Sequence, residues 1–200
     1  MFPPIKLTDI LVNNQLMSVR YIMIKIFVDL DSTLTNFEKA VRDLGETPAT
    51  GLSDNATDEQ KQAMYKAIDD ASVDFWATME WIPDGYALWE LLKPYNPVLL
   101  SSPGEFRDAP GGKQEWVNKN IPGTSLILDP KKWNYAERNA ILIDDNQNNI
   151  GAWEECGGIG ILHTDAISTA KKLLNLIRSK PLLTIASAVR NLGNILLSEQ

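Results

Sequence analysis

The stretch that decides the fold is Ile-Phe-Val-Asp-Leu-Asp-Ser-Thr-Leu at residues 26–34. It begins as an apolar run that favours a buried strand, and it ends in two carboxylates one residue apart, Asp29 and Asp31. Side chains alternate between faces along a strand, but past its last ladder bond the chain can coil so that both carboxylates enter one crevice. Open α/β sheets bind their ligands at this carboxyl end of the strands. The stretch therefore predicts a site at the edge of a parallel sheet.

The composition of the 200-residue chain limits the classes of function that fit it. A hydrophobic content of 44% is enough for the core of one ordinary domain, with room for a small insert. The net charge of −7 argues against bulk nucleic-acid binding, so a phosphate-bearing substrate would need a metal or placed lysines. One cysteine excludes an intrachain disulfide. Because the sequence shows no signal peptide and no membrane-length apolar run, we expect a cytoplasmic protein without a membrane partner.

Five short apolar segments alternate with amphipathic helical patterns, which predicts a doubly wound α/β fold with a parallel sheet. The predicted strands are Ile22–Val28, Pro97–Leu100, Ser125–Leu128, Ala140–Ile143 and Gly158–Leu162. About seventy residues of mostly helical pattern separate the first two strands, whereas a βα crossover needs only a dozen or so. We expect the excess to form a small helical cap, inserted after the first strand and lying over its carboxyl end.

The expected domain organisation follows from this insertion. Residues 22–35 and 95–180 would form the α/β core, and residues 36–94 the helical cap. Residues 1–21 would be an N-terminal extension whose role the sequence does not reveal. Residues 181–200 would form a C-terminal amphipathic helix, and its apolar face is a candidate surface for a homodimer.

Residues 140–146, Ala-Ile-Leu-Ile-Asp-Asp-Asn, repeat the pattern of an apolar strand that ends in acids. Asp144 and Asp145 would then share a sheet edge with Asp29 and Asp31. Unit charges about 4 Å apart repel by about 4 kcal/mol at an effective dielectric near 20, so such a cluster requires a cation or shifted pKa values. Oxygen ligands without nearby His or Cys favour Mg²⁺ over Zn²⁺. A simple turn or helix cap at Asp144-Asp145 is the alternative, and it explains this segment only when it is taken alone.

Two segments between these strands are suited to binding phosphate. Residues 97–102 form an apolar strand that ends in the hydroxyls of Ser101 and Ser102, and Ser101 can donate to a phosphate oxygen. Lys113 follows two glycines at the start of a predicted helix, where it can reach the phosphate and neutralise crowded aspartates. Each segment alone is equally typical of a turn or a surface charge, so the order of the segments carries the prediction.

In this order the acidic, serine and lysine segments resemble the motifs of the haloacid dehalogenase (HAD) superfamily of phosphohydrolases, over residues 22–165. The resemblance implies a HAD-like Rossmannoid core and a phosphoric monoester hydrolase. It implies that Asp29 is the nucleophile, forming an aspartyl-phosphate, and that Asp31 is the general acid and then the general base. Dehalogenase-like members lack the second acid, so Asp31 favours phosphoryl chemistry.

The resemblance also implies a role for each remaining motif residue. Thr33 would hold the turn after the first strand. The residues that would bind the phosphoryl group are Ser101, Ser102 and Lys113. The cofactor would be Mg²⁺, and its implied ligands are Asp29, Asp31 through its carbonyl, Asp145 and, as an adjacent or alternative ligand, Asp144.

Within the superfamily, the chain looks like the 5′(3′)-deoxyribonucleotidases and their phage and bacterial relatives. The similarity is carried by Phe75-Trp-x-x-Met-Glu-Trp-Ile-Pro-Asp-Gly85, Leu-Leu-Ser-Ser-Pro at 99–103, Lys113-x-x-Trp-Val-x-Lys119 and Leu142-Ile-Asp-Asp145. It implies a nucleoside monophosphate substrate whose base is held by cap aromatics, here Phe75, Trp76 and Trp81. Core packing is the alternative for these three side chains. Arg107 is a candidate second phosphate contact.

Other functions remain open at this stage. They are hydrolysis of another small phosphate, hydrolysis of a nucleic-acid 3′-phosphate end, and a non-catalytic module that binds a nucleotide or a partner. Rival catalytic motifs are incomplete: Cys156 has no arginine placed to cradle phosphate, and His163 has no flanking Arg-His-Gly. Gly158-x-Gly160 lacks the third glycine of a dinucleotide-binding fingerprint.

Overall fold

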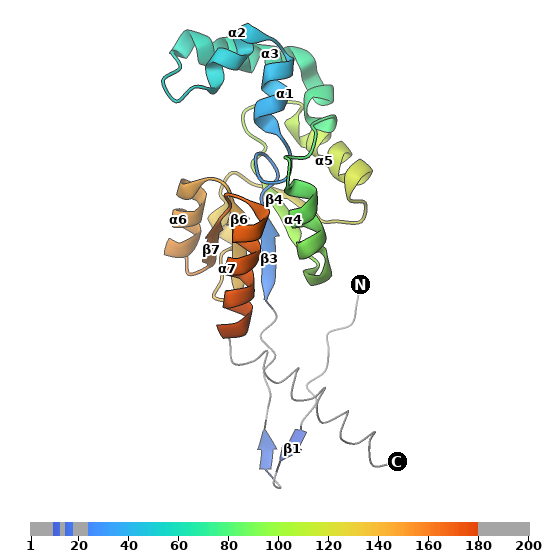
Figure 1. Ribbon diagram of the computed structural model, residues 1–200, viewed down its shortest axis with the longest axis vertical. Helices are drawn as coiled ribbons and strands as arrows, with labels where there is room; N and C mark the ends of the chain where they lie inside the picture. The colour runs from blue at the N-terminus through green and yellow to red at the C-terminus, as the bar shows by residue number, and fades with distance from the viewer. Residues whose placement is uncertain (1–9, 13–14, 18–23, 180–200) are drawn as a thin grey trace. The chain divides into compact units, whose positions relative to one another are not determined.

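The computed structural model describes residues 10–12, 15–17 and 24–179 of the chain (Figure 1). The chain divides into two compact units, one of residues 24–175 and one formed by both chain ends. In the unit of chain ends, β1 (Ile10–Val12) pairs antiparallel with β2 (Gln15–Met17). The C-terminal helix expected at 181–200 lies outside the described residues, as does most of the expected N-terminal extension. Within the described ranges, no helix is both long and apolar enough to cross a bilayer.

The larger unit is built on a five-stranded parallel sheet in the order β5-β4-β3-β6-β7, which confirms the predicted fold class. The strands are β3 (Lys25–Val28), β4 (Val98–Ser101), β5 (Leu126–Leu128), β6 (Ala140–Asp144) and β7 (Ile159–Leu162). The chain starts in the middle with β3, adds β4 and β5 on one side, and then returns to add β6 and β7 on the other. The strand order therefore reverses between β3 and β6, and open α/β sheets bind ligands outside such a reversal.

The sheet core explains why β3 and β6 are rigid supports for a site. Every residue of β6 is buried, and so are Ile26, Phe27 and Val28 of β3. Strands buried on both faces read as continuous apolar runs, as the sequence does here. Phe27 packs edge-on against Trp153, with ring centroids 5.3 Å apart, and Trp153 donates through Nε1 to the Ala140 carbonyl. The two central strands thus share one packed cluster.

The helices lie around the sheet and beyond its carboxyl edge (Figure 1). Beside the sheet are α4 (Gly85–Leu92), α6 (Gln147–Glu155) and α7 (Ala166–Ser179), while α5 (Ala109–Asn120) lies next to α3, nearer the carboxyl edge. Beyond the carboxyl end of β3 are α1 (Phe37–Asp43), α2 (Glu46–Ala49), the short helix η1 (Thr50–Leu52) and α3 (Asp58–Ala77). Two further short helices are η2 (Lys93–Tyr95) and η3 (Lys132–Tyr135). We call the group α1, α2, η1 and α3 the helical cap.

Helix α3 begins as its sequence predicts, and it contains a break that the sequence does not announce. Thr57 caps the helix, and Thr57 and Gln60 form the reciprocal pair of a capping box. Ser72, inside α3, adopts φ +55° and ψ −141°, which is not helical. The last part of α3, residues 73–77, therefore runs in a different direction from the part before Ser72, and it carries Phe75 and Trp76.

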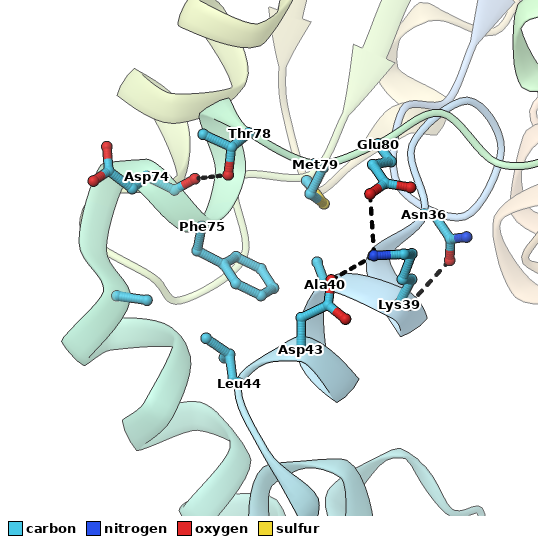
Figure 2. Close-up of a pocket in the computed structure, with 11 residues that line it drawn as sticks. Asn36, Lys39, Ala40, Asp43, Leu44, Asp74, Phe75, Thr78, Met79 and Glu80 are labelled. Carbon is cyan, nitrogen blue, oxygen red and sulfur yellow. Dashed lines mark hydrogen bonds and ion pairs between the residues drawn. The ribbon is translucent and has the colours of Figure 1, made fainter.

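Two linker segments join the cap to the sheet, and they hydrogen-bond to each other through their backbones. Asn36 N donates to the Glu80 carbonyl at 2.8 Å, and Ile82 N donates to the Leu34 carbonyl at 2.9 Å. Beside the linkers lies a hollow of about 250 Å³, in which Lys39 bridges Asp43 and Glu80 (Figure 2). None of the acids expected at the sheet edge lines this hollow, so it is separate from the candidate site.

Candidate functional site

The register of the sheet brings the two acidic strand ends together. In the β3–β6 pairing Val28 stands opposite Ile143, and Asp29 N continues the ladder to the Ile143 carbonyl at 2.9 Å. Asp29 and Asp144 therefore leave the sheet side by side at its carboxyl edge. Asp29 is 6% exposed and Asp144 is fully buried. Two carboxylates that are this close and this poorly hydrated require positive partners.

A tight turn after β3 brings Asp31 back to the same crevice. Ser32 has a positive φ of 60°, and its N donates to the Thr35 carbonyl at 2.8 Å. Thr35 Oγ1 donates to Asp31 Oδ1 at 3.5 Å and so reaches across the base of the turn. Thr33 Oγ1 donates to Asp145 Oδ1 at 3.3 Å. Thr33 thus links the turn after β3 to the acids after β6, beyond the turn-holding role expected from the sequence.

Lys113 lies where the sequence analysis expects it, between an acid and a serine. Its Nζ donates to Asp31 Oδ2 at 2.6 Å, to Ser101 Oγ at 3.1 Å and to the Ser102 carbonyl at 2.5 Å. The side chain is 1% exposed. The ammonium also lies 4.9 Å from the ring centroid of Trp76, a favourable cation–π distance. The structure therefore brings together Asp31, Ser101, Ser102 and Lys113 from three separate segments.

A second buried lysine, Lys132, was not among the predicted site residues. Its Nζ donates to Asp29 Oδ1 and to Asp144 Oδ2, both at 2.6 Å, and the residue is 3% exposed. Burial alone would lower the pKa of Lys132, but the attraction of Asp29 and Asp144 raises it above its ordinary value. The ammonium is therefore a fixed positive charge between the two most buried acids of the site.

The loop after β5 holds Lys132 in this position. Asp129 Oδ1 accepts from Lys131 N at 2.7 Å, and Asp129 Oδ2 accepts from the Asn134 side chain at 3.3 Å. These bonds shape the short helix η3, at whose start Lys132 lies. The sequence signal for Lys132 is weak, since the residue stands in a loop without periodicity beside a second lysine, Lys131.

One ammonium shared by two acids leaves the crevice short of positive charge. The pKa of Asp29 is raised from 3.8 to about 7, chiefly by burial. The charge of Lys132 lowers this pKa, and the charges of Asp144 and Asp31 raise it. Burial and the charge of Asp144 also raise the pKa of Asp145. Because a raised carboxyl pKa means that the negative form is disfavoured, the site would gain from a further cation.

Three of these acids have the chemistry and spacing to hold one. Asp29, Asp144 and Asp145 each offer a carboxylate oxygen, and the three oxygens lie within 4.8 Å of one another. Both oxygens of Asp144 already accept hydrogen bonds, from Lys132 and from the side chain of Asn149. Asp144 is thus better placed to orient its neighbours than to ligate directly. The residues fit a divalent cation with a preference for oxygen ligands.

A pocket of about 300 Å³ opens from these acids toward the cap. Its lining combines polar groups, among them both lysines, Ser101 and Ser102, with aromatic rings. The aromatic residues that line it are Phe37 of α1, Trp76 of α3 and Phe106 of the loop after β4. Phe106 and Trp76 have ring centroids 5.3 Å apart. The pocket therefore combines charged groups of the sheet edge with aromatic rings from the cap and from the loop after β4.

Three residues proposed from the sequence as substrate contacts do not line this pocket. Phe75 is buried in the cap, where it packs edge-on against Phe37. Trp81 packs on Trp116, with ring centroids 4.8 Å apart, so core packing is the better interpretation of Trp81. The Arg107 side chain is 87% exposed and pairs with its neighbour Asp108. Of the four, only Trp76 lines the pocket, although its side chain, at 3% exposed, is as buried as that of Phe75. The half-buried Phe37 and Phe106 also line it, and they were missed because no local pattern distinguishes them from core aromatics.

The sequence matches no protein-family model and no curated protein. Among solved structures, the fold is similar to a hydrolase from Pseudomonas syringae, at 17% identity and a TM-score of 0.41, over 74% of this chain and 89% of that chain. It is similar to L-2-haloacid dehalogenase from Xanthobacter autotrophicus, at 12% identity and a TM-score of 0.49, over 84% of this chain and 88% of that chain. It is also similar to a haloacid dehalogenase-like hydrolase from Streptococcus pneumoniae, at 14% identity and a TM-score of 0.45, over 74% of this chain and 90% of that chain. Two of the three are described as hydrolases and the third as a dehalogenase, and at this similarity no reaction is assigned to the present chain.

Proposed function

We propose that this protein is a Mg²⁺-dependent phosphomonoester hydrolase of the haloacid dehalogenase type, and that it acts on nucleoside monophosphates. One observation carries the proposal: two buried lysines bracket a pair of acids at the reversal of the sheet, Lys132 on Asp29 and Lys113 on Asp31. Phosphoryl transfer is catalysed mainly by positioning and by neutralising negative charge. A crevice that offers both a nucleophile and fixed ammonium groups is suited to it.

The different surroundings of the two acids support different roles for them. Asp29 is nearly buried and is held by Lys132, so it is the nucleophile whose carboxylate oxygen attacks phosphorus. The side chain of Asp31 is 26% exposed, so it can reach both the leaving oxygen and water. In the first step the Asp29–phosphorus bond forms, the bond to the leaving oxygen breaks, and Asp31 gives that oxygen its proton. In the second step water attacks phosphorus, Asp31 takes a proton from the water, and the Asp29–phosphorus bond breaks.

The remaining polar groups bind and orient the phosphate. Lys113 Nζ lies between Asp31 and Ser101, so a phosphoryl group there would receive donors from both Lys113 and Ser101. Asp29, Asp145 and the backbone carbonyl of Asp31 would hold the Mg²⁺. Asp144 would help to orient these groups and would not ligate the metal itself. When bound, Mg²⁺ supplies charge neutralisation for the phosphoryl oxygens. It would also offset the surplus of carboxylates that raises the pKa of Asp29.

The aromatic side of the pocket supports a nucleotide as the substrate. Phe37, Trp76 and Phe106 line the same pocket as the acids, and flat bases gain about 1–3 kcal/mol from stacking on such rings. Another small phosphate would need only the polar end, so hydrolysis of a different phosphomonoester is the second candidate. A non-catalytic binding module would have no use for two lysine-paired acids at one sheet edge.

Phosphate release across a panel of substrates tests the proposal. The panel contains deoxyribo- and ribonucleoside 5′- and 3′-monophosphates, sugar phosphates and a 3′-phosphorylated oligonucleotide, each with Mg²⁺ and with EDTA. We expect metal-dependent release concentrated on the mononucleotides. Release from other phosphates alone would support phosphomonoester hydrolysis and would reject nucleoside monophosphates as the substrates. Absence of release from every substrate, by folded protein, would favour the binding module.

A further inference from the structure

A side-chain hydrogen bond joins the helical cap to the loop that follows β4. Ser72 Oγ donates to Asp108 Oδ2 at 2.7 Å. Asp108 occupies the N-cap position of α5, where an aspartate commonly accepts from the first amides of its own helix. Among the described contacts, its side chain makes no capping bond to α5. The carboxylate therefore stabilises the contact with the cap and not the start of its own helix.

The backbone of Ser72 marks the point where α3 changes direction. Its φ of +55° with ψ of −141° is a conformation that side-chain-bearing residues rarely adopt. Such conformations persist where the surrounding structure holds them, and they concentrate at ligand sites. Here the bond to Asp108 holds the residue, and the redirected piece, residues 73–77, carries Trp76 into the pocket.

The redirected piece of α3 lies directly against α5. A Cβ atom added at Gly112 would stand 2.5 Å from Trp76 Cβ and 2.6 Å from the Val73 carbonyl oxygen, so glycine alone fits between the helices. The residue after Gly112 is Lys113, whose ammonium lies 4.9 Å from the Trp76 ring centroid. The direction of the piece thus sets the position of an aromatic wall relative to a phosphate-binding lysine.

The segment on the Asp108 side of this hydrogen bond carries another aromatic residue of the pocket, Phe106. Phe106 lies just before Asp108 in the chain, and its ring centroid is 5.3 Å from that of Trp76 and 5.6 Å from that of Tyr65. Ser72 and Asp108 therefore connect the segments that carry two pocket rings, Trp76 and Phe106, which contact each other at an interplanar angle of 54°.

We infer that Ser72 and Asp108 form a clasp that fixes the contact between Trp76 and Phe106, and with it the shape of the aromatic lining, and so determines the preference for phosphomonoesters that carry a planar ring. This inference rests on the proposed function and adds two positioning residues to it. Neither residue contacts the acids of the sheet edge in the described structure, so the clasp acts on the fit of the ring and leaves the chemical steps unchanged.

Steady-state kinetics on a matched pair of substrates test the clasp. Deoxythymidine 5′-monophosphate and 2-deoxyribose 5-phosphate share the sugar phosphate, and only the first has a ring to stack. In Asp108→Ala and Ser72→Ala, KM for the nucleotide should rise about tenfold while kcat stays within about twofold, because stacking is loosened. Both parameters for the sugar phosphate should stay near those of the wild type.

Two further variants separate the clasp from general loss of structure. Asp108→Asn keeps an oxygen that can accept from Ser72, so it should restore the wild-type KM. Asp74→Ala removes an exposed carboxylate from the same piece of α3 and serves as the matched control. Equal losses on both substrates, or an Asp108→Asn variant as impaired as Asp108→Ala, would overturn the inference.

Hydrogen exchange tests the clasp independently of turnover. Asp108→Ala should speed amide exchange in residues 73–77 and 104–108 and leave β3 and β6 unchanged. Unchanged exchange in the first two segments would overturn the clasp, even in an active enzyme. If the wild type released no phosphate from any substrate, the proposed function would fail, and the exchange result alone would decide whether the clasp exists.

Discussion

The sheet edge and the helical cap contribute to the pocket in different ways. At the sheet edge, buried strands hold Asp29 and Asp144 in register, and the ammonium of Lys132 donates to both of them. In the cap, aromatic rings are placed by helix packing, by one unusual backbone conformation at Ser72 and by its hydrogen bond to Asp108. Under the proposed function, chemistry belongs to the sheet edge and selectivity to the cap. Each prediction below tests the role of one of these two regions.

The largest expected effect comes from the nucleophile. Asp29→Asn keeps the shape of the side chain but removes its negative charge, so kcat should fall by roughly 10⁴-fold or more. The thermal midpoint of the variant should not fall, because the buried charge that it removes is poorly compensated. Full activity in Asp29→Asn would refute the assignment of chemistry to the sheet edge.

The second effect concerns the shared ammonium of Lys132. Lys132→Met leaves Asp29 and Asp144 buried without their common partner, which should cost about 3–5 kcal/mol of unfolding free energy as well as activity. Chemical denaturation measures the loss. Lys131→Met is the matched control, since this neighbouring side chain is exposed and its variant should unfold like the wild type. Equal stability of the two variants would show that the Lys132 ion pairs do not hold the edge together.

The third effect is a pH dependence that originates at Asp29. Its pKa is raised from 3.8 to about 7, chiefly by burial. Between these values the folded protein keeps a proton that the unfolded chain has released, so without metal the unfolding free energy should fall as pH rises through this window. The difference corresponds to at most ~4 kcal/mol. Thermal unfolding in EDTA measures it, and Asp29→Asn should flatten the profile.

Added Mg²⁺ should reverse this trend. Because the metal requires the carboxylate form, its stabilising effect should be small near about pH 5.5 and grow toward about pH 8. A thermal shift that is independent of pH would indicate that the metal does not bind at Asp29.

The smallest effect is expected in the cap. Trp76→Ala should raise KM for a nucleotide about tenfold more than KM for a sugar phosphate, since only the nucleotide stacks. Phe75→Leu, a change in the core of the cap, should lower the thermal midpoint without changing the ratio of the two KM values. If both variants changed the ratio equally, the distinction between pocket and core aromatics would not hold.

The same contrast explains what the sequence could predict. Strands buried on both faces leave continuous apolar runs, and acids at their ends are conspicuous, so the parallel sheet and the meeting of Asp29, Asp31, Asp144 and Asp145 were predictable. Lys113 was predictable from its order among these segments. The α/β fold class is confirmed by the strand order, while the catalytic roles stay predictions.

What the sequence did not reveal depends on paths of loops and on helix packing. Lys132 reaches its acids only because Asp129 shapes the loop that carries it. Phe106 likewise lies in an irregular loop, and Phe37 has the same helical spacing as a core residue. Phe75 and Trp81 are as aromatic as Trp76, and only the direction of the chain after Ser72 decides which ring enters the pocket.

The return of the chain from one half of the sheet to the other has a consequence for how the protein forms. The ammonium of Lys132 bridges one acid that is 103 positions away along the chain and another that is 12 positions away. During synthesis, β3, β4 and the cap emerge well before β6 and its acids. A nascent chain of that length would therefore contain Asp29 without Lys132 and without β6, one of the two strands that pair with β3. Contacts between distant segments form late and slowly in folding. Metal-binding ability should therefore be absent from nascent chains that end before β6, and should arise in one step when that strand pairs with β3.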